Sequence, residues 1–302
     1  MTRPTKSERQ QYQVDYAPDS DFSAYARLLQ SKWREEKGYP IDPVKKYGNF
    51  IDLPFAKETK ANFLTNNIRE LVSLEVAEGK KKKALIAEPR IWNNLLSSQP
   101  LCYNLFGELK LNLDLATQLF SKLFPNKIGQ VTEIKFEYSP GRGNVEYTGD
   151  HSAFDVFVEY TRNNKQGFMG IEVKYAESLK EETKEQAEKN YKDRYFEISN
   201  QSGKFKSDSI EQLKQPPLSQ IWRDHLLAIS TEKDYDEGCF VFLFPSNNTQ
   251  CQHGVNAFKK YLATDNEEQS GFCPRYLEGF VSALQEISDA DWITELKKRY
   301  LG

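Results

Sequence analysis

Two apolar stretches separated by a turn contain charged residues that could carry out chemistry. Asp155 stands in the aromatic segment 147–160, and Glu172 and Lys174 stand in the apolar segment 167–177. The sequence Asn-Asn-Lys-Gln-Gly at 163–167 is typical of a turn between strands. The pattern therefore predicts a β-hairpin with one acid on its first strand and an acid and a lysine on its second.

The spacing of Glu172 and Lys174 places them on one face of the second strand, because side chains alternate between faces. Charged groups in so apolar a strand cost several kcal/mol unless a partner or a metal compensates. We expect Asp155 and Glu172 to hold a divalent cation across the hairpin, with the Lys174 ammonium beside it. Carboxylate oxygens without Cys or His favour Mg²⁺ over zinc, and Mn²⁺ can substitute for Mg²⁺.

At these residues the sequence resembles the PD-(D/E)xK nuclease superfamily. Asp155 matches the first acid and Glu172-Val173-Lys174 matches the ExK signature, although Phe154 stands where many members have a proline. The chain is most similar to a bacterial restriction-endonuclease-like family over roughly residues 20–285. The segments that carry this likeness are 149–155, 170–175, 93–107 and 220–228.

The resemblance implies a restriction-endonuclease-like α/β core, with a mixed β-sheet flanked by helices. It also implies a Mg²⁺-dependent deoxyribonuclease of restriction or defence type, with Asp155, Glu172 and Lys174 as catalytic residues. In RecB-like members a glutamine begins a helix behind the active site, and Gln220 matches it by order. The tyrosine expected one turn later is absent, and Asp224 and His225 lie in that region.

The resemblance further implies that a helix before the hairpin supplies another acid. Glu108 is the candidate for this third metal ligand, and a surface or capping glutamate is the alternative. Asp150 could replace Asp155 as a ligand, but its place in Thr-Gly-Asp favours local capping. For His225 we expect a structural role.

The ExK tripeptide alone is weak evidence, because it recurs at Glu133, Glu108 and Glu182. The Glu133 copy lies in an amphipathic strand predicted over 130–138. There Ile134, Phe136 and Tyr138 are expected on one face, and Glu133, Lys135 and Glu137 on an ordinary solvated face.

Two rival functions belong to other classes. One is a catalytically inactive nucleic-acid-binding or assembly module that keeps the nuclease fold, and the other is a metal-dependent enzyme acting on small substrates such as nucleotides. A broken triad would mark the first rival, whereas all three positions are intact here. The intact triad favours the enzyme.

The formal net charge of −3 excludes a global basic field, so DNA must be bound by a local patch. Candidates are Arg142 in a glycine-containing loop and the run Lys80, Lys81, Lys82 and Lys83, with a hairpin loop and a solvated turn as the alternatives. A homodimer would suit double-strand cutting. A third mixed basic and aromatic set comprises Tyr191, Arg194, Tyr195, Lys204 and Lys206.

The chain of 302 residues with 38% hydrophobic residues suits one large domain or two small ones. We expect a flexible N-terminal arm over 1–18 and a single nuclease-like domain over 19–302. Helices are predicted from Asp19 or Ser20 to Gly38 and over 57–78, 90–106, 112–124, 217–230 and 289–300. The segment 177–195 is helix-prone, 239–244 is a buried strand, and 276–285 is a strand or short helix.

The four cysteines, with no apolar leader at the N-terminus, favour a reduced cytoplasmic setting. No run of about 18 apolar residues suggests a membrane span. A zinc site from Cys239, Cys251, His253 and Cys273 is not favoured, because the spacings are irregular and no CxxC occurs.

Overall fold

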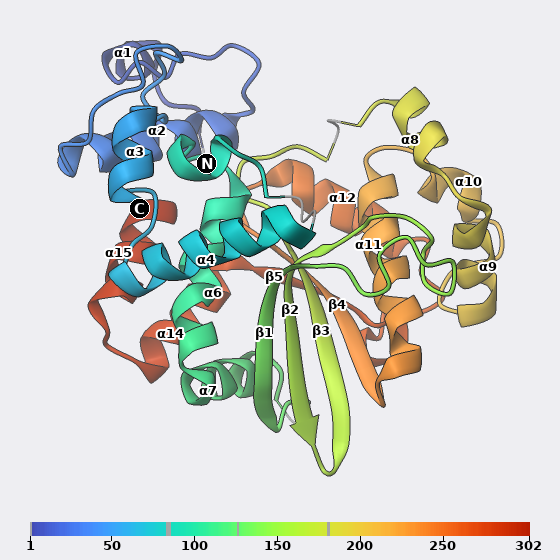
Figure 1. Ribbon diagram of the computed structural model, residues 1–302. Coiled ribbons are helices and arrows are strands. Elements are labelled where there is room, and N and C mark those ends of the chain that lie inside the picture. The colour runs from blue at the N-terminus through green and yellow to red at the C-terminus, as the bar shows by residue number, and fades with distance from the viewer. Residues whose placement is uncertain (1, 83–85, 126, 180–181) are drawn as a thin grey trace.

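The computed structural model describes residues 2–82, 86–125, 127–179 and 182–302 (Figure 1). Helices precede, flank and follow a single described sheet. The elements in chain order are α1 (Lys6–Gln11), α2 (Asp21–Glu36), α3 (Leu53–Thr59), α4 (Asn66–Lys82), α5 (Arg90–Asn93), α6 (Ser98–Leu111), α7 (Leu113–Leu123), β1 (Gln130–Tyr138), β2 (Phe154–Arg162), β3 (Lys165–Val173), α8 (Lys184–Asn190), α9 (Asp193–Ser202), α10 (Ile210–Leu213), α11 (Leu218–Thr231), η1 (Glu232–Asp234), β4 (Glu237–Phe244), α12 (Thr249–Lys259), α13 (Glu267–Ser270), β5 (Phe272–Tyr276), α14 (Leu277–Ile287) and α15 (Asp291–Tyr300).

The sheet has five strands in the order β1-β2-β3-β4-β5. β1, β2 and β3 are antiparallel, whereas β4 and β5 run parallel to β3. The predicted hairpin is confirmed, since Arg162 opposes Lys165 and leaves a two-residue turn. Its residues Asn163 and Asn164 have positive φ values of 50° and 63°, as such turns require.

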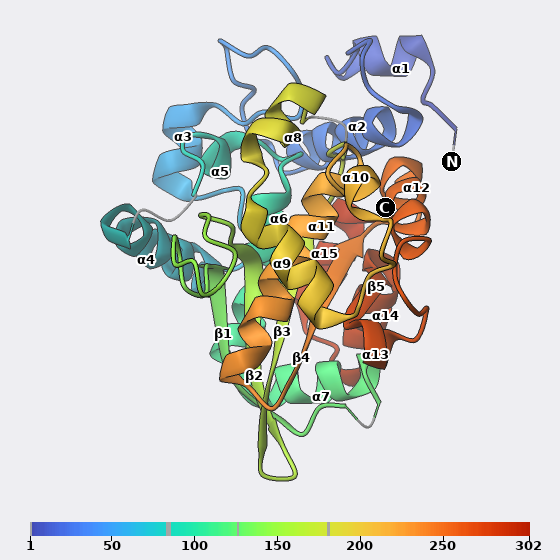
Figure 2. The same ribbon diagram turned by 90° about the vertical axis from the view of Figure 1, so that its right-hand side faces the viewer.

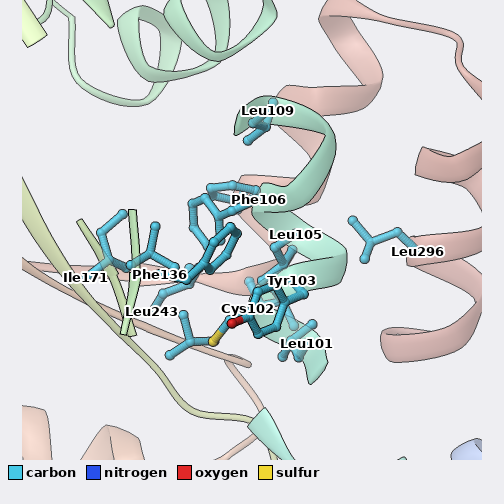
Figure 3. Packing of buried hydrophobic residues seen from close by; sticks show 14 of the residues in the cluster. Leu101, Cys102, Tyr103, Leu105, Phe106, Leu109, Phe136, Ile171, Leu243 and Leu296 are labelled. Atoms are coloured by element: carbon cyan, nitrogen blue, oxygen red, sulfur yellow. The ribbon is translucent and has the colours of Figure 1, made fainter. Parts of the chain in front are cut away.

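Helices cover both faces of the sheet, which confirms the predicted α/β class (Figures 1 and 2). One buried cluster joins α6, α7 and α14 to the face that carries Ile171 and Val173, and the other joins α9, α11 and α12 to the opposite face. Tyr103 of α6 stacks on Phe136 with ring centroids 4.3 Å apart. Figure 3 shows this region, with Tyr103 and Phe106 on the helix and Phe136 and Ile171 on the strands that face it.

Several helices differ from the predicted ranges because side chains interrupt them. The helix predicted over 57–78 is two helices, since Lys60 ends α3 in the left-handed conformation and Thr65 caps the backbone of Ile68 at the start of α4. The helix predicted over 90–106 is likewise divided, because Asn94 pairs with Phe50 and accepts a hydrogen bond from the Leu96 amide. In the segment 276–285, Tyr276 ends β5 and the remaining residues belong to α14.

The first 18 residues, expected to form a loose arm, instead contain an attached helix. Thr5 and Glu8 form a capping box at the start of α1. Val14 is fully buried, and the Ser31 hydroxyl donates to the Tyr12 carbonyl at 2.9 Å. These contacts fix the segment against α2.

Across the described residues, no helix combines the length and the apolar character needed to cross a membrane.

Gly170 of β3 leaves room for the Phe154 ring directly before Asp155. A Cβ at position 170 would lie 2.4 Å from that ring. We expect Gly170→Ala to lower the free energy of unfolding by about 1–3 kcal/mol, because the ring must move within a packed core. Thermal denaturation would measure this loss. The control is Gly279→Ala, whose added Cβ meets nothing within 4 Å, and an unchanged melting temperature in Gly170→Ala would contradict the prediction.

Candidate active site

Three predicted residues come together at the end of the sheet opposite the hairpin turn, where β1 ends, β2 begins and β3 ends (Figure 1). Asp155 is the second residue of β2, and its carboxylate accepts a hydrogen bond from the Val173 amide at 2.8 Å. Val173, whose amide orients Asp155, stands between Glu172 and Lys174 in the sequence. Hairpin pairing thus positions all three groups at one point of the fold.

Glu172 is the centre of the polar contacts in this cluster. Lys174 Nζ lies 2.8 Å from Glu172 Oε1, and the two side chains are only 11% and 9% exposed. Gln220 of α11 donates from Nε2 to the same Glu172 oxygen at 3.0 Å. The structure therefore places the predicted glutamine at the site, on the face of the sheet that α11 covers.

The electrostatics of the cluster oppose the ionised form of Asp155. Burial raises the pKa of Asp155 well above its usual value, and the carboxylates of Glu172 and Glu137 add to this effect, while Lys174 opposes it. Burial disfavours the charged form of Lys174, but Glu172 and Asp155 outweigh burial and raise the pKa of Lys174. Lys174 is therefore a cation at neutral pH.

The donor set suits a hard divalent cation. Within the described residues, no three His, Cys, Asp or Glu side chains form a ready metal-binding group. Asp155 and Glu172 supply carboxylate oxygens whose mutual repulsion a cation would relieve. Mg²⁺ commonly takes one or two protein carboxylates and fills its other positions with water and phosphate oxygens, so two acids are a sufficient protein contribution.

Glu137 is a site residue that sequence reasoning missed. It lies near the end of β1 with φ = 48°, a left-handed conformation that is uncommon for glutamate. The regular alternation breaks here, because Phe136 belongs to the core cluster beneath α6 whereas Tyr138 packs with the cluster on the opposite face. The prediction that Glu137 lies on a solvated face with Glu133 and that Tyr138 shares a face with Phe136 was therefore wrong.

The Glu137 carboxylate points to α6, where it accepts a hydrogen bond from the Gln99 side-chain amide. Burial raises the pKa of Glu137 to about 7, and the Glu172 carboxylate adds to the shift, although Gln99 opposes it. The pKa of Glu137 therefore depends on the charge of Glu172. In the sequence, the signal at Glu137 was its place near the end of a predicted strand, next to the glycine-containing loop at 139–144.

Glu137 should make the stability of the metal-free protein depend on pH. Its pKa is about 7 in the folded state and 4.5 in the reference state, so the folded state binds the proton more tightly and loses stability as pH rises through this window. We expect Glu137→Gln to melt about 2–4 °C above the wild type at pH 8 and to lose this advantage at pH 5. The exposed Glu133→Gln variant is the control, and a pH-independent difference for Glu137→Gln would contradict the assignment.

The structure does not bring Glu108 to the triad. Glu108 lies within α6, where it accepts hydrogen bonds from the Thr65 hydroxyl and from the Asn67 amide at 3.3 Å. Its carboxylate is thereby held at the start of α4. These partners are side chains of the first turn of α4 and the residue before it, whereas Glu137 is an acid whose charge acts on Asp155.

Asp150 has the local capping role that its turn predicted. It accepts hydrogen bonds from Thr148, from Tyr195 and from both the amide and the hydroxyl of Ser152. Burial would raise its pKa, but these donors hold the pKa of Asp150 below its usual value. Its oxygens are thus occupied within the loop that leads to β2.

His225 is a buried structural residue, as expected. Its Nε2 lies 2.9 Å from the Ser270 carbonyl oxygen, and burial lowers the pKa of His225 to about 3. The neighbouring Asp224 is 8% exposed, and one of its oxygens has no hydrogen-bond partner among the described residues. Burial and the Glu172 carboxylate raise the pKa of Asp224 well above its usual value.

Of the predicted DNA-binding residues, the structure describes the side chain of Arg142. Lys83 and the side chains of Lys80, Lys81 and Lys82 lie outside the described residues. Arg142 lines a cavity of about 410 Å³, whose other charged lining residues are Glu75, Glu78, Lys110, Glu133, Lys135 and Glu137. Among the described lining residues, four glutamates outnumber three cations, and this balance disfavours a phosphate there.

Two further segments that carried the resemblance lie on either side of the triad. From 93–107, the start of α6 supplies Gln99 to Glu137, and its Ser98 amide donates to Glu177 at 2.6 Å. From 220–228, α11 supplies Gln220. Both segments therefore position polar groups around the same strand ends.

A family model described as the PD-(D/E)XK nuclease superfamily matches residues 17–302. No curated protein and no solved structure matches the chain. The family match spans nearly the whole sequence and confirms the resemblance to this superfamily.

Proposed function

The chain belongs to the PD-(D/E)XK nuclease superfamily, and on this premise we propose that it is a metal-dependent nuclease that hydrolyses phosphodiester bonds of DNA. The observation that carries the proposal is the recessed contact between Lys174 and Glu172, beside Asp155 and under Gln220. A non-catalytic module has no need to retain a buried ammonium and two converging carboxylates, whose burial is costly.

Asp155 and Glu172 would hold the cation, with Mg²⁺ as the expected metal and Mn²⁺ as a substitute. When bound, Mg²⁺ supplies Lewis-acid stabilisation of phosphate charge and lowers the pKa of a water molecule. The Val173 amide orients Asp155, and Gln220 fixes one oxygen of Glu172. The other oxygen of each carboxylate would be available to the ion.

Lys174 acts as a hydrogen-bond donor in this proposal. Its raised pKa keeps it protonated at neutral pH, so the free protein offers an ammonium rather than a base. Its N–H groups would orient the attacking water and stabilise the negative charge that develops on the pentacovalent phosphate. The role in restriction or defence belongs to the same proposal and is supported by the family resemblance. The cytoplasmic setting is also part of the proposal, and the four free buried cysteines support it.

The test is incubation of the purified protein with plasmid, single-stranded DNA and RNA, in Mg²⁺ or in chelator. We expect DNA cleavage in Mg²⁺ that yields 5′-phosphate ends, and we expect the chelator to stop it. Binding without cleavage under every condition would favour the inactive nucleic-acid-binding module. Cleavage that persists in chelator would overturn the metal-dependent mechanism.

A further inference from the structure

A DNA substrate requires a local cluster of cations, because the net charge of the chain is −3. The described residues that line the Arg142 cavity include more carboxylates than cations. Two members of the mixed basic and aromatic set are also occupied, since Lys204 pairs with Glu232 and Lys206 donates to the Lys260 carbonyl. Among the described residues, the relevant cluster is therefore one in which the cations outnumber the carboxylates and include unpaired lysines.

A second cavity, of about 540 Å³, has the required charge. Residues 149–152 form one wall, and the other lining residues are Lys189, Asn190, Lys192, Tyr195 and Arg223. Lys189, Lys192 and Arg223, which is also paired with Glu182, thus line the cavity with one carboxylate, that of Asp150. This carboxylate already accepts four hydrogen bonds from Thr148, Ser152 and Tyr195, which hold it within its own loop.

The two lysines of this cavity are available to a ligand. Lys189 and Lys192 are exposed, and neither forms an ion pair within the described parts of the chain. Arg223 is anchored by Glu182, which contacts its Nη1 at 2.9 and 3.0 Å. The cavity therefore combines one fixed guanidinium with two free ammonium groups.

Chain connectivity places this cavity next to the candidate active site. Ser152 in its wall precedes Asp155 by three residues, and Arg223 follows Gln220 by three residues on α11. The carboxylates of Glu172 and Asp150 both raise the pKa of the buried Asp224, which follows Arg223 on α11. The same two segments, the start of β2 and the first turns of α11, thus carry residues of both the cavity and the candidate active site.

We infer that this cavity binds the sugar–phosphate backbone of an unpaired DNA strand beside the bond that is cut, through Lys189, Lys192 and Arg223. The inference rests on the proposed nuclease function. Lysine and arginine contacts to phosphates supply most sequence-independent affinity for nucleic acids.

The depth of the site favours an unpaired strand. Glu172 and Lys174 are 9% and 11% exposed, with Gln220 of α11 directly over Glu172. A DNA duplex is stiff over tens of base pairs. Bending its backbone sharply into a recess therefore costs deformation energy that weakens binding. A single strand follows such grooves readily.

The test compares Lys189→Gln/Lys192→Gln with Lys259→Gln/Lys260→Gln. The control lysines line a separate cavity with Lys206, and none of its lining residues lies on β2, β3 or α11. Binding of a fluorescent oligonucleotide, single-stranded or as a duplex, is measured in the Asp155→Asn background with Mg²⁺ at several salt concentrations. Cleavage kinetics are measured with Asp155 intact.

We expect the Lys189→Gln/Lys192→Gln pair to weaken single-strand binding at least tenfold. The slope of log Kd against log[salt] should fall by about 1.4, because each phosphate contact to a single strand contributes about 0.7 to that slope. KM should rise with kcat unchanged, and the control pair should match its parent. Equal effects of the two pairs, or duplex binding as tight as single-strand binding, would overturn the inference. A parent protein that neither binds nor cuts DNA would instead refute the proposed function.

Discussion

Replacing Lys174 by methionine is expected to lower the rate of DNA cleavage by about 10²–10³-fold, because the variant loses a buried donor aimed at charge that develops in the transition state. Methionine keeps much of the apolar volume of the lysine stem, so the fold should persist. In this variant Glu172 keeps its hydrogen bond from Gln220 but loses its ion pair with Lys174. Removing one member of a buried ion pair lowers the free energy of unfolding by about 3 kcal/mol. Single-turnover cleavage and thermal denaturation measure the two effects.

The matched control is Lys135→Met, which alters the other ExK tripeptide in a strand. Lys135 contacts Glu133 and Glu159 on the β1–β2 ladder and has no contact with Glu172 among the described interactions. Its replacement should leave the cleavage rate within a few-fold of wild type. Wild-type activity in Lys174→Met would refute the catalytic assignment, and so would equal losses in both variants.

Replacing Asp155 by asparagine is expected to abolish cleavage and to stabilise the metal-free protein. The pKa of Asp155 is raised on folding, so its ionised form opposes folding, and this cost grows as pH rises through the folded pKa. Asparagine removes the charge but still accepts the hydrogen bond from Val173. We expect the metal-free variant to melt a few degrees above wild type at pH 8, with no activity in Mg²⁺.

Asp150→Asn should show the opposite sign. Hydrogen bonds from Tyr195, Ser152 and Thr148 lower the pKa of Asp150, so its ionised form contributes stability above the unfolded pKa and this stability is lost as pH falls. The variant should therefore melt below wild type at neutral pH. A destabilised Asp155→Asn protein would contradict the charge repulsion assigned to the site, and retained cleavage would contradict its role as a metal ligand.

The paired strands were predictable from sequence because their pattern is local. Two asparagines and a glycine between apolar segments predict a hairpin, and the hairpin brings Asp155 beside Glu172 and Lys174. Gln220 could be selected only through the family resemblance, since its contact with Glu172 spans 48 positions of the chain. Strand periodicity carries no information about which helix covers an acid.

Glu137 shows why pattern alone was insufficient. Alternation assigned it to the solvated face of β1, but a single residue with positive φ reverses the faces at the strand end and turns its carboxylate toward Gln99. A glutamate in this conformation is stabilised by tertiary contacts rather than by its own preference. Glu108 was selected for its place on a helix before the hairpin, and its partners on α4 could not be inferred from spacing.

The central claim is that Asp155 and Glu172 together hold a divalent cation beside Lys174. Anomalous diffraction from crystals of the protein soaked in Mn²⁺ tests it most directly. The account predicts one strong peak between the two carboxylates, about 2.1 Å from an oxygen of each, as expected for a small hard cation. A protein that takes up Mn²⁺ elsewhere, or that shows no peak at these two acids, would contradict the account.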